Sequence, residues 1–197
     1  NSSSYWKWLC KNHIEVIESY GIENFKLIIE KSAYWGEGNL ESPHVKQIIN
    51  DDITIDLKID EVFRQKNDTN RDPNETIQQN LANIILLNYL ENNNYQKYLE
   101  VVEENNFGNP QYVIYKGKRY SFGILNSILE IGFIDKNVNF DKELNIIEVG
   151  AGSGRTCIAL NSFYNVNKYV IVDIPPALFI SEKNIKASFP NKKIFSF

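Results

Sequence analysis

Apolar residues recur every three or four positions through most of the first 140 residues, a spacing that predicts a mainly helical region. Capping residues, glycines and prolines divide this region into separate helices. The predicted helices cover residues 5–20, 22–31, 72–92, 95–104 and 121–132. Residues 43–66 fit two interpretations, because the apolar positions up to 49 have helical spacing and those from 53 to 59 alternate as in a strand.

The first predicted helix has its apolar stripe on one face, and Gly21 supplies a C-terminal stop. The stripe consists of Trp6, Leu9, His13, Val16 and Tyr20. We expect Trp6 to be a core residue and His13 to be a buried, hydrogen-bonded structural residue.

Local signals also place a capped helix and a hairpin further along the chain. Asp72 and Pro73 provide the N-terminal cap of a helix. The apolar face of this helix is predicted to hold Ile77, Leu81, Ile84 and Ile85. Residues 112–118 predict a small hairpin that turns at Lys116-Gly117-Lys118, and Gly132 is expected to end the helix that follows.

The pattern changes near Asp141, where short apolar runs begin to alternate with helical segments. Strands are predicted at 144–149, 169–173 and 193–197, with helices at 155–164 and 177–187 between them. This β-α-β-α-β order implies a parallel sheet with helical crossovers. We therefore expect an α/β fold with a helical region over residues 1–141 and a sheet region over 142–197.

Composition excludes several classes of protein. The 197 residues are 43% hydrophobic, which is enough for a packed core, and a net charge of −4 makes nucleic acid or an anionic membrane surface an improbable partner. No apolar run approaches the ~20 residues of a membrane span, and residues 1–4 do not resemble a signal peptide. Cys10 and Cys157 form no disulfide framework, so we expect a reducing, cytoplasmic location. A homo-oligomer is compatible with all of this.

The chemically informative segment is Glu148-Val149-Gly150-Ala151-Gly152-Ser153-Gly154. Glycines between a strand and a helix let the backbone turn tightly and approach a ligand closely. The N-terminus of the following helix offers unpaired N–H groups to a polar or anionic group. Asp173 is expected at the end of the next strand, where a carboxylate can accept hydrogen bonds from both ribose hydroxyls.

The loop departs from the dinucleotide pattern G-x-G-x-x-G, because Arg155 stands at the third glycine position. With an acid two residues before the first glycine, it resembles motif I of the Rossmann-like, S-adenosylmethionine-dependent methyltransferases. The resemblance implies a Rossmann-like sheet, of which this chain holds the first β-α-β-α-β part. It implies a cofactor site made of Glu148, Gly150, Ala151, Gly152, Gly154, Asp173 and Ile174, with the ribose at Asp173 and adenine against Ile174.

Residues 173–178, together with Phe189-Pro190, resemble more narrowly a family of bacterial sugar O-methyltransferases. That resemblance implies methyl transfer from S-adenosylmethionine to a sugar hydroxyl, with S-adenosylhomocysteine as product and a saccharide or other small molecule as acceptor. Two alternatives remain open: a non-catalytic methyltransferase-like binding or assembly module, and a nucleotide-dependent oxidoreductase.

A sugar hydroxyl is a weak nucleophile that needs a general base or a metal ion. The chain's two histidines, His13 and His44, are weak candidates for the base, and a surface position is the alternative for His44. Trp35 is the preferred aromatic for stacking on a sugar, and Arg155 is a second candidate for contact with the substrate. No residues show metal-ligand spacing, although a divalent ion remains a second way to activate the acceptor.

The sheet predicted at the C-terminal side stops at its third strand, whereas the methyltransferase family has seven. The first strand would then have an unpaired edge, and its faces would be only partly covered. The sequence also contains no methionine. We therefore expect it to be the front part of a longer enzyme.

Overall fold

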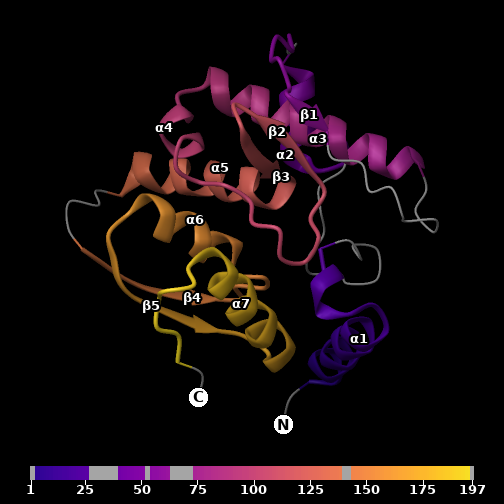
Figure 1. Cartoon of the computed structure of the whole chain (residues 1–197), viewed down its shortest axis with the longest axis vertical. Coiled ribbons are helices and arrows are strands. Elements are labelled where there is room, and N and C mark those ends of the chain that lie inside the picture. Colours follow the sequence, from indigo (N-terminus) through magenta and orange to yellow (C-terminus); the bar gives the residue numbers. More distant parts are fainter. Residues whose placement is uncertain (1–2, 27–39, 52–53, 63–72, 139–142, 196–197) are drawn as a thin grey trace. The chain divides into compact units, whose positions relative to one another are not determined.

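The computed structural model describes residues 3–26, 40–51, 54–62, 73–138 and 143–195 of the chain, and it is a mixed α/β structure (Figure 1). Contacts within the chain divide it into two compact units. Unit 1 consists of Asn1–Gly36, Asn105–Asn109 and Val138–Phe197, and unit 2 of Glu37–Glu104 and Pro110–Asn137. The units differ from a division at residue 141, because the first helix packs against the helix over residues 175–188 and residues 105–109 also belong to unit 1.

The described part of unit 1 contains a two-stranded parallel sheet, three helices and a short 3-10 turn. Its elements are α1 (Ser4–Tyr20), the 3-10 turn η1 (Ile22–Asn24), β4 (Leu144–Val149), α6 (Arg155–Phe163), β5 (Val166–Val172) and α7 (Pro175–Ser188). The parallel register places Glu148 opposite Ile171 and Val149 opposite Val172. The order β-α-β-α therefore agrees with the sequence prediction. The predicted third strand is wrong over residues 193–195, which form no strand.

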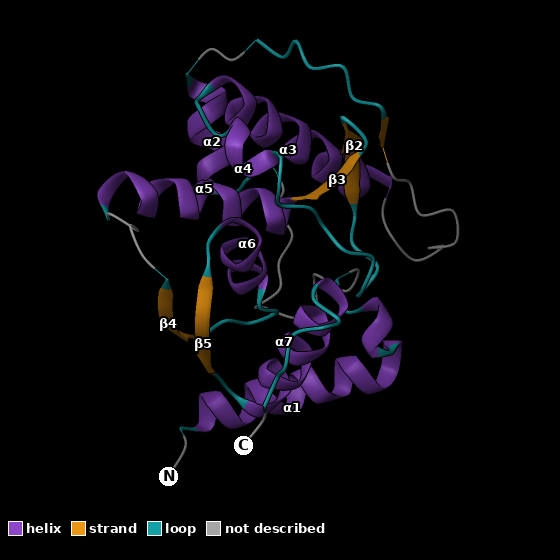
Figure 2. Cartoon of the chain, turned by 60° about the vertical axis from the view of Figure 1, so that its left-hand side comes forward, coloured by secondary structure: helices purple, strands orange, loops and turns teal. Residues whose placement is uncertain are grey.

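The two faces of this sheet differ in exposure. Side chains at alternating positions of β4 and β5 are partly buried on one face of the sheet. Helix α6 packs against β5, beside which it lies in Figure 2. The other face exposes four apolar side chains: Ile147 (73%), Val149 (79%), Val170 (39%) and Val172 (52%). Within the described residues β4 pairs with β5 alone, so its other edge has no strand beside it.

Unit 2 combines a small antiparallel sheet with four helices. Its elements are α2 (Pro43–Asn50), β1 (Glu61–Val62), α3 (Pro73–Asn92), α4 (Gln96–Leu99), β2 (Tyr112–Tyr115), β3 (Lys118–Ser121) and α5 (Phe122–Asn137). The sheet order is β1-β2-β3. The predicted hairpin is confirmed, and its two turn residues, Lys116 and Gly117, have φ of 51° and 74°, as a two-residue hairpin turn requires.

Of the two interpretations of residues 43–66, the helical one is correct over residues 43–50. The strand predicted from the alternation further on is wrong over residues 54–59, which form no strand. The predicted helix over 95–104 is much shorter, because α4 ends at Leu99. The structure describes residues 22–26 of the helix predicted over 22–31, and these residues contain only the short 3-10 turn η1.

The buried face of α3 differs from the predicted stripe. Ile77 is 53% exposed and Leu81 is 41% exposed, so two of the four predicted core positions are wrong. The buried face instead carries Ala82, Ile85, Leu86, Leu87 and Leu90 together with Gln79, Asn80, Asn83 and Asn88. A hydrophobicity pattern does not predict this buried face, because several of its residues are polar. Each buried amide needs a hydrogen-bond partner, and the sequence alone does not identify that partner.

Candidate functional site

The glycine loop joins β4 to α6 in a conformation that ordinary side chains rarely adopt. Gly150, Gly152 and Gly154 have φ of 81°, 56° and 76°, all in the left-handed region that favours glycine. The N–H of Gly150 donates to the Val172 carbonyl at 2.9 Å, so the loop begins fastened to the end of β5. A Cβ atom at Gly150 would meet no atom within 4 Å, which leaves open space beside the backbone at this point.

Asp173 accepts a backbone N–H with each oxygen of its carboxylate, one from the glycine loop and one from the start of α7. Its Oδ2 accepts the N–H of Gly152 at 2.8 Å, and its Oδ1 accepts the N–H of Ile174 at 2.7 Å. Ile174 is the extended N-cap residue of α7, and Pro175 follows in the first turn. One side chain therefore fixes the glycine loop and the start of α7, and each of its oxygens retains a second lone pair.

Glu148 lies on the face of β4 that the helices cover. Its Oε2 accepts a hydrogen bond from the Tyr169 hydroxyl, 2.8 Å away on β5. Burial, and secondly the charge of Glu148, raise the pKa of the Cys157 thiol to about 12. Cys157 is therefore a neutral packed residue of α6 at neutral pH.

Helix α6 begins without a side-chain cap, after a glycine in the left-handed conformation. Gly154 is its N-cap, in a left-handed conformation and with no side-chain hydrogen bond. Arg155 is the first helical residue and is half-buried. The first turn contains no acidic side chain, so its N–H groups and the positive end of the helix dipole favour a polar or anionic ligand group.

His13 lies in the same unit as the loop, in α1. Its side chain is 0% exposed, and burial lowers the pKa of its imidazole, while the nearby Asp173 carboxylate acts in the opposite direction. Burial of His13 is thus confirmed, and the side chain lies within electrostatic range of the end of β5. His44 is exposed, in α2 of unit 2.

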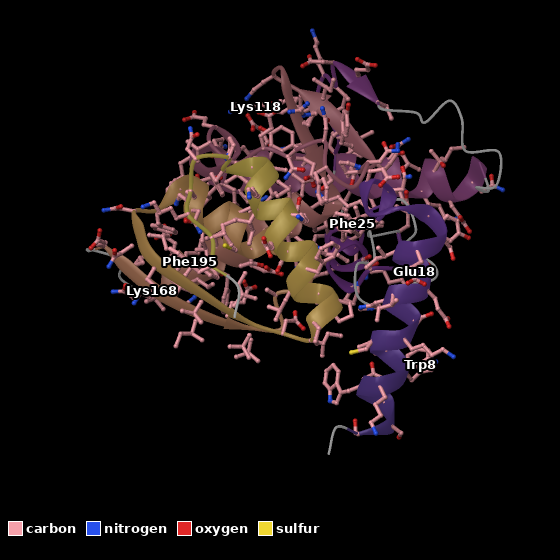
Figure 3. All side chains as sticks on the ribbon, turned by 60° about the horizontal axis from the view of Figure 1, so that its bottom comes forward. Trp8, Glu18, Phe25, Lys118, Lys168 and Phe195 are labelled. Atoms are coloured by element: carbon pink, nitrogen blue, oxygen red, sulfur yellow. The ribbon has the colours of Figure 1, made fainter. Side chains whose placement is uncertain are left out.

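The structure tests one of the two predictions about the tryptophans. Trp6 is 41% exposed, so its predicted place in the core is wrong. It forms an exposed aromatic group at the start of α1 with Tyr5 and Trp8, the last of which is labelled in Figure 3. Trp35 lies outside the described residues.

Sequence reasoning missed a polar side chain that contacts the loop. Asn184 of α7 is 1% exposed and donates from Nδ2 to the Ser153 carbonyl at 2.8 Å. A signal for it exists, because Ala177, Ile180 and Asn184 recur at helical spacing and the last is polar. A polar residue within an apolar stripe predicts a buried hydrogen bond.

The described residues contain neither a metal-binding cluster nor a membrane-spanning helix. No group of three or more His, Cys, Asp or Glu side chains is arranged to hold a metal ion there. Within the same ranges, every helix is too short or too polar to cross a membrane.

Comparison with protein-family models, with curated proteins and with solved structures finds no match to this chain.

Proposed function

We propose that this chain carries the cofactor site of an S-adenosylmethionine-dependent O-methyltransferase acting on a sugar hydroxyl. The observation that carries the proposal is the Asp173 carboxylate, which holds the N–H groups of Gly152 and Ile174 at the carboxyl end of a parallel sheet. Ligands of open α/β sheets bind at this end of the strands, beside the loop that follows the first of them.

The residues present fit the proposed cofactor. Open space beside Gly150 admits a ligand close to the backbone. The second lone pair on each Asp173 oxygen can accept a hydrogen bond from a ribose hydroxyl while the bonds from the Gly152 and Ile174 N–H groups remain. Ile174 is half-buried at the start of α7 and offers apolar surface next to that position.

S-adenosylmethionine, when bound, supplies a methyl group that its sulfonium has already activated. The protein then has to position the acceptor oxygen and exclude water. The sugar acceptor is supported by the Asp173–Leu178 and Phe189-Pro190 segments, which resemble the sugar O-methyltransferases.

Isothermal titration with S-adenosylhomocysteine tests the cofactor assignment. We expect wild type to bind, and Asp173→Ala and Gly152→Val to weaken binding at least ~10-fold, because they remove the loop contact or the left-handed glycine. Asp60→Ala is a matched control, since the Asp60 carboxylate also accepts a glycine N–H, that of Gly117 at 3.0 Å, in unit 2. Its affinity should equal that of wild type.

Parallel titrations separate the alternatives. Binding of a nicotinamide or flavin dinucleotide in place of S-adenosylhomocysteine would establish the oxidoreductase class. Binding of S-adenosylhomocysteine without any methylated product from a panel of sugars and nucleotide sugars, read by mass spectrometry, would favour the non-catalytic module. The methyltransferase proposal fails if wild type binds no S-adenosylhomocysteine.

A further inference from the structure

A buried amide connects the glycine loop to distant parts of the chain. The Nδ2 of Asn184 donates to the carbonyl of Ser153, the residue between Gly152 and Gly154. Because the amide is 1% exposed, water cannot readily replace this bond. The Ser153 carbonyl, and with it the path of the loop into α6, therefore depends on the position of Asn184.

The other end of the same amide accepts two hydrogen bonds. Its Oδ1 accepts a hydrogen bond from Lys26 Nζ at 3.2 Å and another from Asn105 Nδ2 at 3.0 Å. Asn105 Nδ2 also lies 2.6 Å from the Ser188 hydroxyl, one turn further along α7. Asn184 thus joins the three separate stretches of sequence that make up unit 1.

Two of those stretches, around residues 24–26 and 105–109, pack firmly against each other beside this amide. The N–H of Lys26 donates to the Gly108 carbonyl at 2.8 Å. The rings of Phe25, labelled in Figure 3, and Phe107 have centroids 5.6 Å apart. A Cβ at Gly108 would come within 2.3 Å of the Phe25 ring, so this ring packs against the Gly108 backbone as closely as glycine allows. A displacement of residues 24–26 or 105–109 must therefore reach Asn184.

α7 is also packed tightly against the end of the loop. A Cβ at Gly154 would lie 3.0 Å from Ile185 Cδ1 and 3.2 Å from Ser181 Cβ, one residue after Asn184 and three before it. This packing leaves the amide little freedom to find another acceptor. A cationic donor at Oδ1 also polarises the amide and strengthens the bond that its Nδ2 donates.

We propose that Asn184 is a positioning residue that sets the affinity of the glycine loop for its ligand, and that Lys26 and Asn105 act on the loop through it. The proposal rests on the proposed function in one respect, since the ligand is taken to be S-adenosylmethionine. Its consequence is that the 24–26 and 105–109 segments control cofactor binding without contact with the cofactor.

The main test replaces the donor and keeps the acceptor. Asn184→Asp leaves an oxygen for Lys26 and Asn105 but presents a carboxylate oxygen to the Ser153 carbonyl. We expect S-adenosylhomocysteine to bind about 10-fold more weakly, as loss of a buried hydrogen bond predicts. Asn88→Asp is the matched control, because Asn88 is also 1% exposed and donates to a backbone carbonyl, that of Thr54 at 3.1 Å, in unit 2.

Two readouts distinguish positioning from a general loss of stability. Amide hydrogen exchange at Gly152 and Gly154 should be about 10-fold faster in Asn184→Asp than in Asn88→Asp. Lys26→Met should weaken binding about threefold in wild type and have no effect in the Asn184→Leu background, because its influence passes through the amide. Unchanged loop exchange with unchanged affinity in Asn184→Asp would overturn the proposal.

Failure of the proposed function has a different signature. If wild type binds no S-adenosylhomocysteine but loop exchange still accelerates in Asn184→Asp, the cofactor assignment falls and the positioning role stands. Should Asn184→Asp lose its cooperative unfolding transition, Lys26→Met and Asn105→Ser provide the test. Equal loop exchange in both of these variants and in wild type would then overturn the proposal.

Discussion

Asp173 performs a structural task that its position in the sequence does not reveal. A strand-end carboxylate was expected to face a ligand, and the structure shows that both its oxygens already accept backbone N–H groups of Gly152 and Ile174. Hydrogen bonds to a charged acceptor are about twice as strong as neutral ones. The same side chain that is proposed to bind ribose therefore also builds the loop beneath it.

His13 is expected to make stability depend on pH. Burial lowers its folded-state pKa below the ordinary value of 6.5, so the unfolded chain binds a proton more readily than the folded chain. The free energy of unfolding should then be level above pH 6.5 and fall as pH decreases from 6.5 toward the lowered pKa. In urea titrations, His13→Gln should be about 1–3 kcal/mol less stable at pH 7 and should lose this contribution to the pH dependence.

The second histidine provides the control for this prediction. His44 is exposed, so His44→Gln should retain the pH dependence of wild type. A wild-type stability that rises on acidification below pH 6.5, by an amount that His13→Gln abolishes, would contradict the assigned direction of the shift.

At the scale of elements, Gly132 shows how tertiary packing overrides a local signal. Glycine predicts a helix end, yet α5 continues to Asn137, and the Tyr95 ring packs directly on the Gly132 backbone. A Cβ at this position would come within 2.1 Å of the ring, which is itself only 5% exposed. The glycine is there to admit an aromatic ring and not to end the helix.

Gly132→Ala should therefore destabilise unit 2, although alanine is the better helix former by about 1 kcal/mol. Overpacking predicts a net loss of ~1–3 kcal/mol in the free energy of unfolding, measured by urea denaturation. In the Tyr95→Leu background the shorter side chain gives way, so the same substitution should cost less or stabilise. Equal costs in the two backgrounds would mean that the ring is not the cause.

Elements with strong local signals could be predicted from the sequence, and elements defined by distant partners could not. The hairpin at Lys116-Gly117 and the strand–loop–helix around the glycines follow from short-range backbone requirements. The buried face of α3 depends instead on amide partners such as the Asn80–Gln111 pair, 31 residues apart. The Asn184 contact with Lys26 spans 158 residues, and no local pattern predicts such a pairing.

At the scale of the whole molecule, the sheet of unit 1 places an apolar surface in water. β4 and β5 each contribute two exposed branched side chains on the face opposite α6, and Ile147 and Val149 are more than 70% exposed. The sequence predicts partly covered faces because the sheet would stop at its third strand, and these four side chains are exposed in the structure. Exposed apolar patches of this kind are sites of association or of dye binding.

Polar substitutions on the exposed face of this sheet should reduce dye binding with little effect on the free energy of unfolding. Ile147→Thr combined with Val170→Thr should lower the fluorescence of a bound hydrophobic dye, while the free energy of unfolding changes by less than about 1 kcal/mol, because threonine retains β-branching and little buried area is lost. Ile146→Thr, on the partly buried face beneath α6, is the opposite control and should lower stability while leaving dye fluorescence unchanged. If the double variant instead unfolds as readily as Ile146→Thr, the two faces are equally buried in solution and the uncovered side of the sheet is in contact with another part of the protein.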